Sequence, residues 1–506
     1  MLTPFKQSWI YLRKRFGYKI YIYIAIILYS IVFSAIMLSA HYAFRTYAWD
    51  LGIFNQAFWN TLHGRLFDYT SESVYTTTGN FLGVHFGPIL FLILPLYAAF
   101  PYPELLIVTS PIIVALGAIP VYELARLILK NDRVALLLGV SYLLYPPLQG
   151  AIISGFSLEI IALPIFLFIV YYLIRGDFAK LSLAFILGLA THEASAFVIA
   201  FIGLYGAWHY RSLRSKGFQA SVIITTMSIV YYVFAQNIRV FLGWTQQPSL
   251  WHEWAIIGAE SPSSVPFQVI MNPIGALNSL AFDAIAKVVF LLMFLIPLAF
   301  LPMVGVSALL PTLPYLFLGL FSSYPGYYSI GSHYGAFLVP FFFVALILGM
   351  AKLEKIPRFR VSTMRTAKVV FVLSLVSLVA ILPTTYVDYV SFDSGDAHGR
   401  ILFEALSMIP QNASVLTQNN IFPHVSGRAN AYTIPSPNWS KEYQRIANET
   451  LQNLRKVEID YVLIDLKSEP YSASSGTLIL NEFVLKWNNY DKIVDQDGVM
   501  LFRLRT

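Results

Sequence analysis

Carboxylates and histidines are the side chains with which this chain could transfer protons, because it contains no cysteine. Ionisable groups in or beside membrane segments are costly, so each one is a candidate functional residue. Those that map to the outer side of the predicted membrane segments are Asp50, Asp68, Glu72, His85, Glu159, His192, Glu193 and His333. Their convergence on one side of a helical bundle predicts a site that opens outward and can exchange protons.

The first outer loop, residues 44–80, holds the clearest of these candidates, Asp50. After Asp50, apolar residues recur at helical spacing and predict an amphipathic helix lying on the membrane: Leu51, Phe54, Ala57, Phe58 and Leu62. Asp50 would stand at the N-cap of this helix, where a carboxylate accepts backbone N–H groups. Capping is one interpretation of Asp50. The other is a general base at the water–lipid boundary, and the two are not exclusive.

Seven other positions are predicted to bind substrate: His85, Glu159, His192, Glu193, His333, Tyr334 and Arg65. All but Arg65 also have a structural interpretation. The first histidine precedes a Gly-Pro break, where water alone could satisfy it. The first carboxylate opens an apolar helix, a position that favours a negative charge in any case. His192 and Glu193 interrupt an apolar run and could form a hydrogen-bonded turn. His333 and Tyr334 could belong to an aromatic belt.

The elements that must position these groups are membrane helices. The chain has 506 residues, of which 57% are apolar and 12% are charged, about half the charged fraction of a soluble protein. This composition excludes a soluble enzyme, a disordered chain and a coiled coil. The net charge of +7 is interpreted as cytoplasmic flanks of membrane helices rather than as nucleic-acid binding.

Apolar length and charge together predict the topology. A basic N-terminal flank places the N-terminus in the cytoplasm, and further basic clusters mark the same side: Arg126/Lys130/Arg133, Arg175/Lys180, Arg211/Arg214/Lys216 and the run from Lys352 to Lys368. Counting between these markers predicts about eleven crossings: 20–43, 105–128, 134–152, 159–174, 180–191, 194–209, 219–241, 283–301, 304–321, 335–351 and 369–387. The sequence thus predicts a multi-pass cell-membrane protein that is mainly α, with its C-terminus outside.

The last part of the chain has ordinary soluble composition. We expect residues 1–387 to form a transmembrane domain, with interfacial helices in the outer loop 44–104, and residues 388–506 to form a small extracytoplasmic α/β domain. Residues 491–505 read as two strands around Asp497-Gly498, a hairpin signal. All three glycosylation sequons, at Asn412, Asn438 and Asn448, fall in this part. They predict a glycoprotein, although chance sequons in a polar domain would look the same.

Several of these motifs resemble an uncharacterised family of prokaryotic predicted membrane proteins. They include the run from Trp49 through Gly64, His85-Phe-Gly-Pro, Thr191-His-Glu, His333-Tyr334 and His424-Val-Ser-Gly-Arg, and they extend over nearly the whole chain. That family is similar to the GT-C superfamily of polytopic glycosyltransferases. The resemblance implies a GT-C-like helical bundle, a polyprenyl-phosphate sugar donor and Asp50 as the base.

The chain departs from the pattern of this family at two places. It has Gly155-Phe-Ser-Leu where the family often has Asp-Phe-His before the glutamate that matches Glu159. It also has His192 where the family often has lysine before the glutamate that matches Glu193. The second change would make a cationic contact to a donor phosphate weaker or dependent on pH.

Three functions remain to be weighed. In a membrane glycosyltransferase, Asp50 would deprotonate an acceptor on the outer face, and a cation would stabilise the leaving phosphate. The candidates for that cation are His85, His333, Arg65 and Arg239. The alternatives are a non-catalytic anchor that presents residues 388–506 to a protein partner and, less favoured, a lipid or solute transporter. No metal-binding motif stands out, so a divalent cofactor is left open. Membrane lipid is the expected environment, and the composition fits a thermophilic archaeon.

Overall fold

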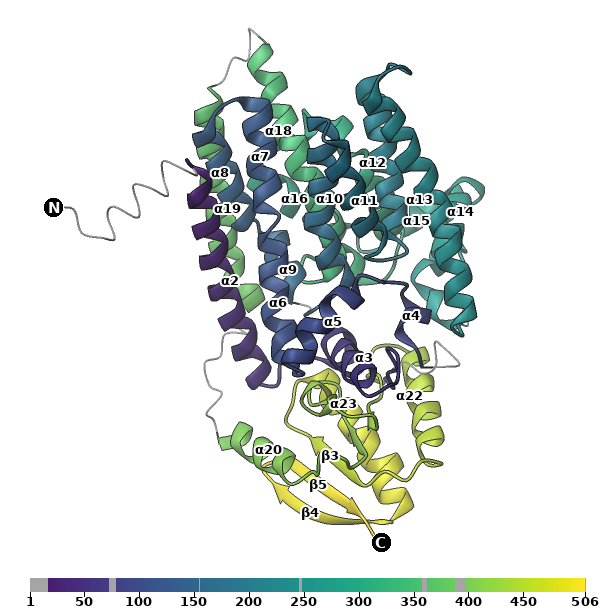
Figure 1. Cartoon of the computed structure of the whole chain (residues 1–506). Helices are drawn as coiled ribbons and strands as arrows, with labels where there is room; N and C mark the ends of the chain where they lie inside the picture. Colours follow the sequence, from purple (N-terminus) through teal and green to yellow (C-terminus); the bar gives the residue numbers. More distant parts are fainter. Residues whose placement is uncertain are drawn as a thin grey trace, which may run out of the picture.

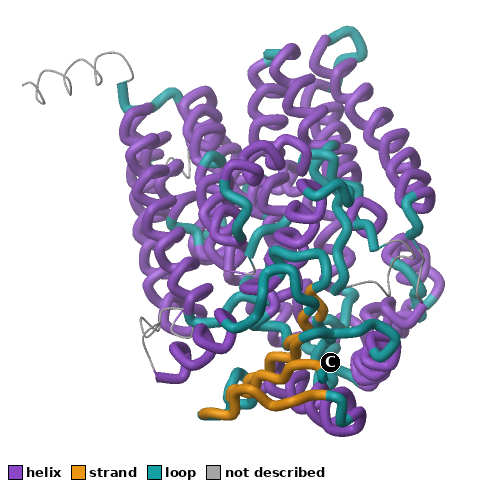
Figure 2. The backbone as a smooth tube through the Cα atoms, turned by 60° about the horizontal axis from the view of Figure 1, so that its bottom comes forward, coloured by secondary structure: helices purple, strands orange, loops and turns teal. Residues whose placement is uncertain are grey.

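The long apolar runs form helices that stand side by side, with a strand-containing region at one end of the bundle (Figure 1). In this computed structural model the described residues are 17–71, 79–153, 155–244, 248–356, 362–386 and 397–505. The N-terminal cations and Glu72, which entered the sequence analysis, lie outside these residues. Figure 2 shows that helices dominate and that the strands gather in one place. The prediction of a mainly helical membrane bundle with a small C-terminal α/β part is confirmed.

The helices of the first half of the chain are α2 (Lys19–Tyr42), the π-helical turn η1 (Ala48–Gly52), α3 (Ile53–Leu62), α4 (Phe81–Val84), α5 (Leu90–Ala99), α6 (Pro103–Ala115), α7 (Ala118–Leu129), α8 (Asp132–Leu143), α9 (Pro146–Ile153), α10 (Leu158–Arg175), α11 (Phe178–Leu189), α12 (Ser195–Tyr210) and α13 (Lys216–Phe241). The following part contains η2 (Pro248–Ile257), α14 (Val265–Met271), α15 (Pro273–Ala281), α16 (Ala284–Leu295), η6 (Val306–Thr312), α17 (Leu313–Leu320), η8 (His333–Phe337), α18 (Val339–Lys355) and α19 (Thr363–Tyr386).

Seven helical segments in the described part of the chain are long and apolar enough to span a bilayer, and the bent pair α15 and α16 would make an eighth. Three of the eleven expected crossings, 180–191, 194–209 and 304–321, correspond to shorter apolar helices. The count of eleven therefore stays a prediction. The connections α7–α8, α10–α11 and α12–α13 carry or border basic clusters and lie at the end of the bundle away from the strands, as do the C-terminal end of α18 and the start of α19 (Figure 1).

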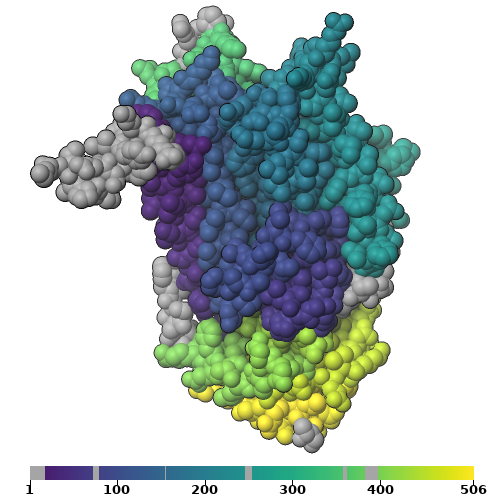
Figure 3. Space-filling view, in the orientation of Figure 1, coloured from purple at the N-terminus to yellow at the C-terminus, as the bar shows by residue number. Residues whose placement is uncertain are grey.

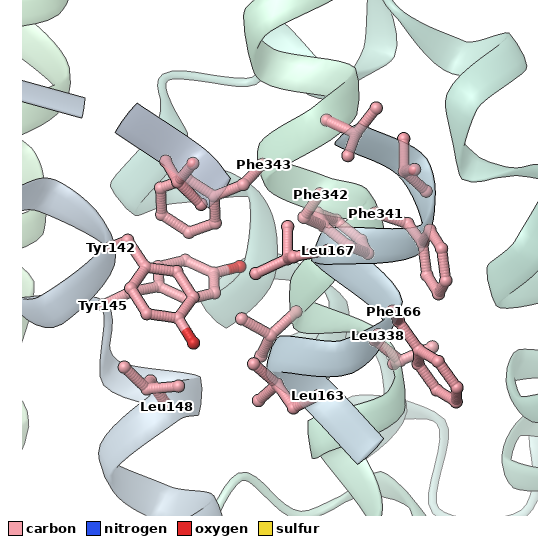
Figure 4. Close-up of a cluster of buried hydrophobic side chains, with 14 of the residues drawn as sticks. Tyr142, Tyr145, Leu148, Leu163, Phe166, Leu167, Leu338, Phe341, Phe342 and Phe343 are labelled. Atoms are coloured by element: carbon pink, nitrogen blue, oxygen red, sulfur yellow. The ribbon is translucent and has the colours of Figure 1, made fainter. Parts of the chain in front are cut away.

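Aromatic rings fill the centre of the bundle (Figure 4). The phenols of Tyr142 and Tyr145 are fully buried, and each donates a 2.7 Å hydrogen bond to a backbone carbonyl, of Val114 and Phe294 respectively. A buried phenol without such a partner would be costly. Gly117 makes room for the first ring, since a Cβ there would lie 2.1 Å from the Tyr142 hydroxyl. This packing fixes α8 against α6 and α18.

The C-terminal region, which we define as residues 397–505, contains a five-stranded sheet of order β2-β1-β3-β5-β4. Its elements are α20 (Ala397–Ser407), β1 (Val415–Thr417), α21 (Phe422–Val425), β2 (Ala431–Tyr432), α22 (Lys441–Leu454), β3 (Tyr461–Asp465), α23 (Pro470–Ile479), β4 (Tyr490–Gln496) and β5 (Val499–Leu504). The strands β2, β1 and β3 are parallel, and β5 and β4 are antiparallel. The predicted hairpin at Asp497-Gly498 joins β4 to β5.

The C-terminal region packs against one side of the first outer loop and lies directly beneath it in Figure 3. The side-chain amides of Asn55 and Gln56 are fully buried in this contact. Asn55 donates to Ser426 Oγ at 2.8 Å, and Gln56 donates to the carbonyls of Arg428 and Ala431 at 3.2 Å each. The helix expected to lie on the membrane is therefore covered on its polar face by protein. Buried amides need partners, and the C-terminal region supplies them.

Gly52 marks the tightest point of this contact. A Cβ at Gly52 would lie 2.5 Å from Cδ1 of Phe422, a ring that is itself fully buried. We expect Gly52→Ala to weaken the docking by about 1–3 kcal/mol through overpacking. Amide hydrogen exchange should then speed up by about five-fold to a hundredfold at residues 48–52 and 418–425, because local opening becomes easier.

Gly427→Ala is the matched control, since a Cβ there has its nearest contact at 3.7 Å in the same interface. It should leave exchange at both segments unchanged. Equal exchange rates in Gly52→Ala and the parent protein would contradict the packing described here.

Candidate functional site

Asp50 does not cap a helix, which corrects one interpretation of the sequence. Helix α3 begins at Ile53 with Gly52 as its N-cap, and no side chain caps it. Asp50 instead lies within the π-helical turn η1 at φ 71° and ψ −89°. This is the γ-turn region of backbone space, which is rare and strained for a residue with a side chain. A strained backbone persists where the surroundings fix it, so Asp50 needs firm support on both sides.

The C-terminal region provides that support. Ala48, two residues before Asp50, donates its backbone N–H to Asn419, with 2.9 Å to the carbonyl and 2.8 Å to Oδ1. Gly52, two residues after Asp50, packs on Phe422. The carboxylate between these anchors keeps 27% of its side-chain surface exposed. It is held in place by its backbone and stays accessible to a ligand.

A chain of ionisable side chains runs inward from Asp50. Oδ2 of Asp50 lies 3.3 Å from Nδ1 of His333, an electrostatic contact rather than an aligned hydrogen bond. Nε2 of the same imidazole lies 3.9 Å from Oε1 of Glu159. Glu159 in turn lies 4.0 Å from Nε2 of His192. We call these residues, with Glu193, His85 and Arg239, the buried network.

Glu193 is the most heavily bonded member of the buried network. Its carboxylate accepts the backbone N–H of Phe86 at 2.9 Å and contacts Nδ1 of His85 and Nη1 of Arg239 at 3.3 Å each. Burial raises the pKa of Glu193, but the positive charge that His192 carries in acid, the charge of Arg239 and the hydrogen bond from His85 more than offset this and lower it below its ordinary value. Glu193 is therefore ionised, and the guanidinium of Arg239 compensates its negative charge.

The pKa values of the two histidines beside Glu193 are shifted in opposite directions. Nδ1 of His192 accepts the backbone N–H of Ala194 at 2.9 Å, so the ring proton sits on Nε2, facing Glu159. Burial lowers the pKa of His192, which is 6% exposed, so this ring is neutral near pH 7. His85 is partly open at 44% side-chain exposure; burial lowers its pKa, but the hydrogen bond and charge of Glu193 raise it above the ordinary value.

Local sequence explains how each member is presented. Ser157 caps α10 by accepting the N–H of Ile160, which starts that helix so that Glu159 lies in its first turn. His192 and Glu193 occupy the short turn between α11 and α12. Arg239 lies in the last turn of α13, where its Nε donates to the carbonyl of Gly83 at 3.2 Å and its guanidinium lies 4.3 Å from the ring of Trp244.

Most of the predicted site residues are brought together, and a few are not. Tyr334 joins the network, with its ring 4.2 Å from that of His333. Arg65 pairs instead with Asp68 at 3.2 Å, and within the described residues no contact links it to the network. Arg239, which the sequence offered only as one cation among several, is the strongest addition. Its one sequence signal is a lone cation ending an apolar helix.

His85, His192 and Glu193 also form a group whose ligand atoms all lie within 4.8 Å of one another. Three side chains placed in this way could together bind a metal ion. However, Arg239 occupies Oε1 of Glu193, and Ala194 occupies Nδ1 of His192. A cation at this place would meet a guanidinium, so the donor set fits a self-neutralised network better than a metal centre.

Comparison with known proteins identifies the family of the chain. The family model described as "Predicted membrane protein (DUF2079)" matches residues 40–501. The chain belongs to this family. That confirms the resemblance of its motifs to an uncharacterised family of membrane proteins. No curated protein matches the chain.

Among solved structures, the crystal structure of ArnT from Cupriavidus metallidurans bound to undecaprenyl phosphate is similar over 93% of this chain and 97% of that chain. The sequence identity is 10% and the TM-score is 0.46. A similarity at this level says nothing of substrate or chemistry.

The departures from the family pattern fall at the network itself. A Cβ at Gly155 would lie 4.0 Å from Cβ of Asp50, so an aspartate at this position would place a second carboxyl group beside the first. Gly155 has φ +104°, which a residue with a side chain rarely adopts. His192, standing where lysine is frequent, is neutral and supplies no fixed charge.

The pairing of Glu193 with Arg239 predicts strong coupling between the two. Removing one partner leaves the other buried and uncompensated, which costs about 3–5 kcal/mol. We expect Glu193→Gln and Arg239→Gln each to destabilise the protein by about that amount, and the double variant to cost clearly less than their sum. Unfolding by detergent titration measures the four free energies. The same cycle on the exposed pair Arg65–Asp68 should give a coupling of at most about 1 kcal/mol. Additive costs at Glu193 and Arg239 would refute the pairing.

The raised pKa of His85 predicts a definite dependence on pH. A group whose pKa is higher in the folded state stabilises that state at low pH, and the contribution is lost as the pH rises through the folded pKa. In Glu193→Gln the pKa of His85 should fall below its ordinary value, since burial and Arg239 remain. Histidine NMR titration, assigned with His85→Gln, measures this; an unchanged pKa would show that Glu193 does not control the charge of His85.

Proposed function

We propose that this protein transfers a sugar from a polyprenyl-phosphate donor to an acceptor hydroxyl, at the end of the bundle that bears the C-terminal region. The observation that carries the proposal is Asp50: an accessible carboxylate on a strained backbone at the open end of a buried network. Strain of this kind is concentrated at functional sites. The resemblance of the first-loop motif to GT-C enzymes implies the same role.

In the proposed reaction, Asp50 accepts the proton of the acceptor hydroxyl as its oxygen attacks the anomeric carbon of the donor sugar. The bond between that carbon and the phosphate oxygen breaks, and polyprenyl phosphate leaves with both electrons. His333 orients the carboxylate from 3.3 Å away. Arg239 and protonated His85 provide positive charge at the far end of the network, which favours the anionic leaving group.

The proposed topology puts this chemistry outside the cell. The basic connections lie at the end of the bundle away from the C-terminal region, and positive charge favours the cytoplasm. Residues 388–506 would then be an extracytoplasmic domain that meets the acceptor or a protein partner. Asn412 and Asn438 are exposed and available for glycosylation. Asn448 lies inside α22 and donates to the carbonyl of Gln444 at 2.9 Å, so it is the weakest of the three sites.

The second candidate function is a membrane anchor for the C-terminal region. It is favoured by the buried amides of Asn55 and Gln56, because docking alone explains those positions in the first-loop motif. It leaves unexplained why Glu159 and Glu193 should be buried at 8% and 5% exposure beside a strained Asp50. Transport needs polar groups with a path to both sides, and the network lies at one end.

The test is turnover of a lipid-linked sugar. Purified protein in a membrane-lipid extract should release polyprenyl phosphate, detected by mass spectrometry. Asp50→Asn should lower the rate by about 10²- to 10⁴-fold, the usual contribution of a general base, while the protein stays folded. Asp68→Asn is the matched control, because its side chain is 28% exposed in the same loop and lies outside the network.

Unchanged release by Asp50→Asn would remove Asp50 from the chemistry. Absence of both release and polyprenyl-phosphate binding in the parent protein would favour the anchor.

A further inference from the structure

A second polar site lies at the opposite end of the bundle. A cavity of about 160 Å³ opens there between α2, α7, α10 and α11. Its wall is formed by Lys19, Glu123, Tyr171, Tyr172, Arg175 and Lys180, with the half-buried side chains of Ile119 and Phe168 completing it. Helix α7 packs against both α2 and α10, and α10 packs against α11. In Figure 1, α10 and α11 meet at the end away from the C-terminal region. The cavity therefore shares no residue with the buried network.

Positive charge is in excess around this cavity. Glu123 is shared by two cations, at 2.7 Å from Lys19 and 2.9 Å from Arg126. Lys180 pairs with Asp177 at 3.2 Å. Arg175 has a neutral partner, donating to the phenol oxygen of Tyr171 at 2.6 Å, and within the described residues it forms no ion pair. Four cations thus face two carboxylates, and the unpaired guanidinium is on the cavity wall.

The wall combines groups that suit a phosphate with groups that suit a lipid. A guanidinium and an ammonium are the usual partners of phosphate oxygens, and phenol hydroxyls can donate to them as well. Ile119 and Phe168 give the cavity an apolar side. Basic cavities between membrane helices at the cytoplasmic surface bind the headgroups of anionic lipids. The volume suffices for a phosphate group with a small substituent.

We propose that this cavity binds the phosphate headgroup of an anionic membrane lipid. Arg175 contacts the phosphate, Lys180 and Lys19 flank it, and Glu123 holds Lys19 in place. The lipid tail lies along the apolar side of the cavity. The site is independent of the proposed transferase reaction, because it lies at the other end of the bundle and uses none of the same residues.

The experiment uses the full chain, purified in detergent and studied by native mass spectrometry with lipids of matched acyl chains. Phosphatidylglycerol should bind in a saturable way, and phosphatidylcholine should bind weakly. Arg175→Gln combined with Lys180→Gln should lower the affinity for phosphatidylglycerol by about tenfold or more, since each cation near the surface contributes appreciably. Both side chains are exposed, so the variant should fold.

Arg211→Gln is the matched control. Arg211 ends α12, stacks on Trp208 at 4.9 Å and is absent from the cavity wall. It should leave lipid binding unchanged. Equal affinity of the double variant and the parent protein would overturn the proposal, and so would equal losses in Arg211→Gln. Inorganic phosphate is added in a last experiment as a competitor of phosphatidylglycerol. If it displaces the lipid at a concentration equal to that of the lipid, the site binds a soluble anion and the assignment to a lipid is wrong.

Discussion

The backbone of Asp50 is the constraint on which the rest of the outer end depends. Its γ-turn conformation costs about 1–3 kcal/mol, so the chain would relax if nothing held it. Asn419 holds Ala48 on one side of it, and Phe422 packs on Gly52 on the other. The C-terminal region is thus part of the site even though it contributes no ionisable group to the network. The docked C-terminal region therefore holds the backbone that carries the carboxylate.

Inside the bundle, the charges of the buried carboxylates must be compensated by neighbouring groups. Two carboxylates, Glu159 and Glu193, are buried where solvation is poor, and each would be prohibitive alone. Arg239 and His85 neutralise Glu193, and His333 connects Glu159 to Asp50. His192 stays neutral between them because burial lowers its pKa. The network therefore connects the interior to the accessible carboxylate of Asp50, and each of its two buried carboxylates has histidine or arginine neighbours.

Much of this was predictable from local patterns. Turn chemistry predicted the hairpin at Asp497-Gly498, since its signal is contained in a few adjacent residues. Apolar length predicted the long helices, and the clustering of carboxylates and histidines at one end followed from counting crossings. These inferences succeed because each depends on hydrophobicity or on backbone preference within one segment.

The remainder depends on contacts between distant segments. The strained conformation of Asp50 arises from residues more than 360 positions later, as the separation of 371 between Ala48 and Asn419 illustrates, so the helical spacing around it suggested a simple cap. Asn55 and Gln56 look like the polar face of an interfacial helix until the C-terminal region is seen to cover them. Arg65 was expected at the site, but its hairpin turns the guanidinium towards Asp68 three residues on. The pairing of Arg239 with Glu193 likewise joins α13 to the turn between α11 and α12, two segments that the sequence cannot align.

Turnover in Gly52→Ala tests the central claim most directly, because it moves the support of Asp50 without touching an ionisable group. Release of polyprenyl phosphate should be measured for this variant and for Gly427→Ala at a temperature where both are folded. If the C-terminal region positions the base, Gly52→Ala loses most of its kcat while its KM for the donor changes little, and Gly427→Ala behaves as the parent protein. Parental kcat in Gly52→Ala would contradict the account.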